Sequence, residues 1–224
     1  MGFLGDWELS YDEIDELLTD NPSLRSFVSG YAAEMKCRRQ WFENNHSVTG
    51  VTKYDDHDRA KKGDIAFTYR GELFTVEVKS LQTNHIKRDG NGALSGKFQC
   101  DASDRRTVTF PDGSSVETTC LLVGEFDLLA VNLHGFYKKW VFAFAKNSDL
   151  PRVNGTRGRA RAYTQLQRDN LLATLMPIGD PPDSPYRLEP WSLLDELVKE
   201  RRSGVAPKSP KIVGDDGLFA PGGH

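Results

Sequence analysis

Two acids and a lysine are the residues of this chain whose types and spacing could do chemistry. Asp64 opens one short apolar segment, and Glu77 and Lys79 close the next. The dipeptide Arg70-Gly71 between the segments predicts a two-residue hairpin turn. In the register that this turn sets, Asp64 faces Glu77, and cross-strand neighbours have Cβ atoms about 4.5 to 5.5 Å apart. The sequence therefore predicts two carboxylates close enough to share one cation.

Neighbouring carboxylates repel each other unless a cation, a shared proton or a lysine compensates. Magnesium prefers oxygen ligands and keeps several waters, so Asp64, Glu77 and the backbone carbonyl of Val78 would leave room for water and a phosphate oxygen. Manganese accepts the same ligands and could substitute. A metal there would activate water for phosphodiester hydrolysis, and Lys79 would orient that water or shield the growing charge. The alternative is an ordinary hairpin with a charged solvent face.

Asp64, Glu77 and Lys79 resemble the motif of the PD-(D/E)XK nuclease superfamily, and the likeness to type II restriction endonucleases of that superfamily spans about residues 25 to 155. The resemblance implies an α/β fold with a mixed central sheet flanked by helices. It also implies magnesium-dependent cleavage of double-stranded DNA, with these three residues as the catalytic set. One position departs from the pattern, because Gly63 stands where the motif has proline.

A helix over residues 21 to 42 is predicted to place a further acid beside the hairpin. Asn21 is a suitable N-cap and Pro22 a suitable first residue. Glu34 lies within an apolar stripe, and the resemblance implies a catalytic role for it near a second metal or behind the first. Pairing of Glu34 with Arg38 one turn later is the alternative. The apolar stripe comprises Leu24, Phe27, Val28, Tyr31, Met35, Trp41 and Phe42.

The length of 224 residues and the hydrophobic content of 38% suit one compact domain, expected over residues 1–202, followed by a flexible tail over 203–224. No stretch approaches the roughly 18 apolar residues of a membrane span, and no signal peptide is evident. We therefore expect a cytoplasmic protein that does not bind membranes. Three widely spaced cysteines predict free thiols rather than a disulfide framework or a zinc site.

Charge is unevenly distributed along the chain. Residues 1–21 form an acidic segment with seven acids and no lysine or arginine, so the net charge of −3 leaves +4 for residues 22–224. The strongest basic excess lies between residues 152 and 169 and includes Arg157, Arg159 and Arg161. These arginines are predicted to contact DNA phosphates. A solvated charged loop is the alternative.

The polar stretch from Gln82 to Arg106 shows no strong periodicity, and Arg105 and Arg106 at its end are further candidates for DNA contact. A long loop in a compact domain is often functional, and these side-chain types read base edges and phosphates. The stretch could equally be a surface excursion between strands.

Further strands are predicted over residues 107–110, 116–123, 126–133 and 140–145, the last two apolar enough to be central strands covered on both faces. Helices are predicted over residues 163–175 and 191–202, separated by an irregular segment rich in proline.

Together these features predict a restriction-type endonuclease that acts as a homodimer, with one catalytic site for each DNA strand. A nuclease of repair or recombination that reads DNA structure instead of sequence is one alternative. A DNA-binding module that never cleaves is another, and it would bind with a steep salt dependence and no need for a divalent cation.

Overall fold

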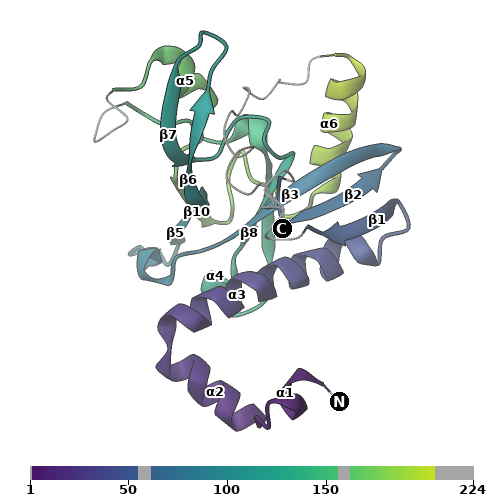
Figure 1. Ribbon diagram of the computed structural model, residues 1–224, viewed down its shortest axis with the longest axis vertical. Helices are drawn as coiled ribbons and strands as arrows, with labels where there is room; N and C mark the ends of the chain where they lie inside the picture. Colours follow the sequence, from purple (N-terminus) through teal and green to yellow (C-terminus); the bar gives the residue numbers. More distant parts are fainter. Residues whose placement is uncertain (1, 55–61, 156–161, 205–224) are drawn as a thin grey trace, which may run out of the picture.

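A mixed sheet of five strands lies at the centre of the computed structural model, which describes residues 2–54, 62–155 and 162–204 (Figure 1). The strands are, in spatial order, β1 (Val48–Lys53), β2 (Ile65–Tyr69), β3 (Glu72–Ser80), β8 (Leu128–Asn132) and β9 (Phe142–Lys146). β3 and β8 are parallel, and all other neighbours are antiparallel. Helices flank this sheet, so the predicted α/β class with a mixed central sheet is confirmed.

The helical elements include a long helix before the sheet and another at the end of the described chain. They are α1 (Phe3–Asp6), α2 (Tyr11–Asp20), α3 (Pro22–Cys37), the π-helix η1 (Arg38–Glu43), η2 (Thr83–His85), α4 (His134–Tyr137), η3 (Asn147–Asp149), α5 (Gln165–Asn170) and α6 (Trp191–Arg202). Salt bridges and hydrogen bonds fasten α6 to the β2–β3 hairpin: Arg202 Nε lies 3.2 Å from Glu72 Oε1, and Tyr69 donates to Asp195 at 2.8 Å.

Two smaller sheets pack beside the central one. The first has three antiparallel strands in the order β10 (Leu175–Asp180), β5 (Leu94–Gln99), β4 (Lys87–Arg88). The second is the antiparallel hairpin of β6 (Asp101–Thr109) and β7 (Ser115–Cys120), which overlap the strands predicted over 107–110 and 116–123. Figure 1 shows this hairpin projecting from the body of the molecule beside α5.

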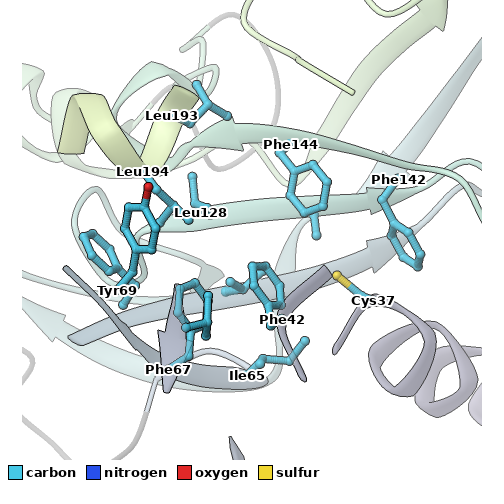
Figure 2. Packing of buried hydrophobic residues seen from close by; sticks show 14 of the residues in the cluster. Cys37, Phe42, Ile65, Phe67, Tyr69, Leu128, Phe142, Phe144, Leu193 and Leu194 are labelled. Carbon is cyan, nitrogen blue, oxygen red and sulfur yellow. The ribbon is translucent and has the colours of Figure 1, made fainter. Parts of the chain in front are cut away.

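The alternation of side chains along the central strands divides the core between the two faces of the sheet. Phe142 and Phe144 of β9 face α3, η1 and α6, whereas Ala143 and Ala145 face β5 and β10. All five residues of β8 and of β9 are buried, as predicted for central strands. Figure 2 shows the packing on the face that α3, η1 and α6 cover. Phe42 and Phe67 stack there with ring centroids 4.4 Å apart.

The region around residues 163–185 differs from the prediction. The helix expected over 163–175 is only the six-residue α5, and the segment expected to be irregular contains the strand β10. β10 pairs along its whole length with β5, far away in the sequence. Proline is tolerated within it because β10 is an edge strand of its sheet.

The polar stretch Gln82–Arg106 is also more regular than predicted, because it forms η2, β4, β5 and the first part of β6. The helix expected over residues 21–42 is confirmed as α3 followed by η1. Asn21 does not cap it, because its side-chain amide donates to the carbonyl of Leu17 instead.

The acidic segment at the start of the chain forms α1 and α2, which Figure 1 shows hanging from the start of α3, away from the sheets. Of the tail predicted over 203–224, only residues 203 and 204 are described. Within the described ranges, no helix has both the length and the apolar character to cross a membrane.

Candidate active site

The β2–β3 hairpin has the register that the sequence predicts. Arg70 and Gly71 both adopt positive φ, 51° and 83°, as a two-residue turn of this kind requires. Phe67 pairs with Phe74 and Ile65 with Val76, and all four side chains are fully buried. The turn and the apolar alternation therefore set which residues of β3 face away from this core: Glu77 and Lys79.

Asp64 departs from the predicted register by one residue. The pairing of β2 with β3 ends at Ile65, and the backbone N–H of Asp64 donates to the carbonyl of Val76 at 2.8 Å. The Asp64 carboxylate then accepts a hydrogen bond from the N–H of Val78 at 2.7 Å. Asp64 is thus fixed beside Glu77 by a backbone hydrogen bond, not by direct cross-strand pairing.

Gly63 allows this departure. Its φ is +83°, and a Cβ atom there would lie 3.1 Å from the carbonyl oxygen of Val76. Proline, which the motif has at this position, cannot adopt a positive φ. The substitution of glycine for proline therefore reflects the backbone path into Asp64.

Lys79 and Glu77 form an ion pair at the end of β3. Lys79 Nζ lies 2.6 Å from Glu77 Oε1, and the two side chains are 23% and 11% exposed. Burial by itself lowers the pKa of Lys79, but the carboxylates of Glu77 and Asp64 outweigh burial and raise it. Lys79 is therefore a cation at neutral pH.

The Asp64 carboxyl is destabilised in its charged form. Burial raises its pKa, and the nearby charges of Glu77 and Glu34 raise it further. Lys79 and the N–H of Val78 act in the opposite direction but do not cancel the shift, so the pKa of Asp64 lies well above its ordinary value. A carboxyl group in such surroundings is one that a cation would stabilise.

Glu34 is brought to the same site from α3. It acts electrostatically on Asp64 and lies along the same cleft. It does not pair with Arg38, the alternative that helical spacing allowed. Arg38 binds Glu43 at 3.0 Å, and Lys53 Nζ of β1 lies 3.4 Å from Glu34 Oε2.

The donor set suits a hard cation that keeps part of its water shell. In the described part of the chain, the N–H of Val78 donates to Asp64 Oδ2 and the ammonium of Lys79 lies against Glu77 Oε1, and the backbone carbonyl of Val78 is the third candidate ligand. No group of three or more histidine, cysteine or acidic side chains in the described part of the chain has the arrangement of a metal site. Two carboxylates, a carbonyl and water would match magnesium, which commonly binds through few protein ligands.

These residues lie in a cleft of about 1460 Å³. One wall is α3, from Pro22 to Glu34, and the other is formed by the stretch after β3 together with β5 and β6. Among the lining residues are Arg25, Lys62 and Arg105, three cations distributed along walls that also carry acids.

The residues predicted to bind DNA divide into three groups. Arg105 is exposed and lines the cleft. Arg106 also lines the cleft, but the protein itself engages its guanidinium, which donates to both carboxylate oxygens of Glu125 and to the carbonyl of Cys120. The Arg106 side chain is 13% exposed and that of Glu125 only 3%, so this ion pair is largely buried. Arg157, Arg159 and Arg161 lie outside the described residues.

Several residues of the site were missed by sequence reasoning. Glu125 lies at the edge of the cleft, with Lys62 Nζ 4.0 Å from its Oε1. The buried Cys100 lies near Lys79 and Glu77, and burial is the main cause that raises its pKa to about 12. Glu125 follows a glycine after an apolar run, and nothing in that pattern distinguishes it from an ordinary turn residue.

Comparison with known proteins adds little to this description of the site. No protein-family model matches the chain, and no curated protein matches it. A solved structure titled "The structure of a bacterial homing endonuclease: I-Ssp6803I" matches with 19% sequence identity and a TM-score of 0.31, over 61% of this chain and 86% of that chain. A likeness this low does not place the chain in a fold group, so the geometry of the site must bear the functional argument.

Proposed function

We propose that this protein is a magnesium-dependent endonuclease that hydrolyses phosphodiester bonds in double-stranded DNA, with a site of the PD-(D/E)XK kind. The observation that carries the proposal is the meeting of Asp64, Glu77 and Lys79 in one cleft, with the pKa of Asp64 raised by burial and by its acidic neighbours. Two acids kept together at this cost fit a site built to hold a cation.

The chain's own residues have distinct roles in this proposal. Asp64 and Glu77 would hold magnesium or manganese together with the carbonyl of Val78, and the N–H of Val78 fixes the orientation of Asp64. Bound there, the metal would lower the pKa of a water and offset negative charge on phosphorus. Lys79 is protonated, so it would donate hydrogen bonds to the attacking water or to a phosphate oxygen rather than accept a proton. Glu34 would support Asp64 from α3.

A restriction-type reading of DNA sequence is supported by polar side chains on the cleft wall opposite α3. Gln82 donates to Gln99 at 3.0 Å, and Gln99 donates to Asp101 at 2.8 Å. All three line the cleft, and amide and carboxylate groups are suited to hydrogen-bond with base edges. Arg105 on the same wall would contact phosphates.

Cleavage of plasmid and phage DNA tests the proposal. We expect discrete fragments with magnesium, none with chelator, and none from Lys79→Ala. The matched control is Lys199→Ala, because Lys199 is exposed on α6 and does not line the cleft. Failure of the wild-type protein to cut any DNA, or full activity of Lys79→Ala, would contradict the proposal.

A second measurement separates metal binding from turnover. Magnesium that binds only the folded protein raises its thermal stability by mass action. We expect this increase in the wild-type protein and its loss in Glu77→Gln.

Two other outcomes would favour the alternative functions. Cutting that requires a branch or an end regardless of sequence would indicate a structure-specific nuclease, and DNA binding without metal dependence or cleavage would indicate a non-catalytic module.

A further inference from the structure

The first two helices expose apolar side chains without burying any. Neither α1 nor α2 contains a buried residue, and Phe3, Trp7 and Tyr11 are 61%, 63% and 83% exposed. We call residues 2–20 the arm, which Figure 1 shows as a hook below α3. Helices of this length are marginal in water unless an apolar face is packed. The arm therefore has the composition of a segment that packs against another surface.

A second exposed apolar surface lies on α3. Leu24, Val28, Tyr31 and Met35 recur at intervals of four, three and four residues, the spacing of a helix-pairing seam. The first three are 42%, 43% and 50% exposed. We call these four residues the α3 seam. It lies on the side of the helix away from the core, because the buried residues of α3 are Ala33 and Cys37, about half a turn round.

Charge restricts what can cover the two surfaces. The acidic segment that forms the arm carries seven acids and no basic residue, which excludes a nucleic acid as its partner. Beside the seam, α3 and η1 expose Arg25, Lys36 and Arg39. Arm against arm would bring acids together and seam against seam would bring cations together, whereas arm against seam pairs opposite charges.

We propose that the partner is a second copy of this chain, with the arm of each copy packed on the α3 seam of the other around a two-fold axis. This arrangement covers both apolar surfaces and forms a closed pair. The purpose of such a dimer rests on the proposed function, because two chains with one site each supply one site for each strand of a duplex.

Sedimentation of the full-length protein without DNA or metal tests the interface. We expect a dimer for the wild type, and a monomer with an unchanged circular dichroism spectrum for the arm variant Trp7→Ala/Tyr11→Ala and for the seam variant Val28→Asp. The matched control is Leu188→Ala, because Leu188 is 51% exposed but lies outside the arm and α3. The control should remain a dimer.

The charge variant Asp15→Lys/Glu16→Lys distinguishes the proposed arm-on-seam pair from an arm-on-arm pair. It should weaken association if the arm faces the basic side of the partner's α3, and strengthen it if the arms lie on each other. A wild-type monomer at every concentration, or a dimer that survives both the arm and the seam variants, would overturn the proposal. Neither result depends on nuclease activity, so this test and the cleavage test fail independently.

Discussion

Replacing Arg106 with alanine is expected to destabilise the protein rather than to weaken DNA binding selectively. Arg106 makes a two-point contact with Glu125 and donates to the carbonyl of Cys120 at 3.1 Å. Without the guanidinium, the Glu125 carboxylate would keep the N–H of Leu122 at 2.8 Å and the ammonium of Lys62 at 4.0 Å. Most of the compensation for a nearly fully buried charge would be lost.

The magnitude follows from this arrangement. Removing one partner of a buried ion pair typically costs about 3 to 5 kcal/mol. The N–H of Leu122 and the charge of Lys62 remain, which places the expected loss near the lower end, at about 3 kcal/mol. For a chain of this size each kcal/mol lowers Tm by about 2 to 4 °C, so Tm should fall by about 6 to 12 °C. Because the cost arises from the uncompensated charge, Arg106→Met combined with Glu125→Gln should recover most of it.

Urea denaturation of Arg106→Ala and of the double variant Arg106→Met/Glu125→Gln measures this cost and its recovery. Arg105→Ala is the matched control: Arg105 is the adjacent exposed residue, so its loss should change the free energy of unfolding by less than about 0.5 kcal/mol. The control should instead reduce DNA affinity and its salt dependence. If Arg106→Ala unfolds like the wild type and binds DNA less tightly, Arg106 contacts DNA and does not compensate the charge of Glu125.

Three further outcomes are expected. Asp64→Asn should stabilise the metal-free protein at neutral pH. Burial and Glu77 raise the pKa of Asp64 in the folded protein, so the free energy of unfolding falls as pH rises from the ordinary carboxyl pKa to the raised one. Urea denaturation in chelator at several pH values should show this fall in the wild type and not in the variant. Phe67→Ala should cost about 3 to 5 kcal/mol by the same assay, since its fully buried ring stacks on Phe42; a loss below 1 kcal/mol would refute that packing. Gly63→Ala should lower stability by at least about 1 to 2 kcal/mol through its positive φ, and a stability equal to wild type would show that the backbone path into Asp64 is different.

Local sequence patterns predicted the structure correctly wherever it depends on residues that are near neighbours in the chain. The Arg70-Gly71 turn set the register of the β2–β3 hairpin, and so the face on which Glu77 and Lys79 lie. The apolar runs of β8 and β9 marked central strands, and α6 begins and ends at the predicted residues. In each case the signal is a short-range alternation or periodicity that the backbone must follow.

Contacts between segments that are distant in the sequence determined the parts of the structure that local patterns did not predict. β10 is a strand because it pairs with β5, some 80 residues earlier, although its own sequence is rich in proline and glycine. Arg105 and Arg106 are neighbours of one residue type and both line the cleft, yet Arg105 is exposed whereas the guanidinium of Arg106 is bound by Glu125. Burial and charge compensation are properties of the packed molecule. The sequence could therefore name the chemical groups of the site, but tertiary packing determined which of them face the cleft.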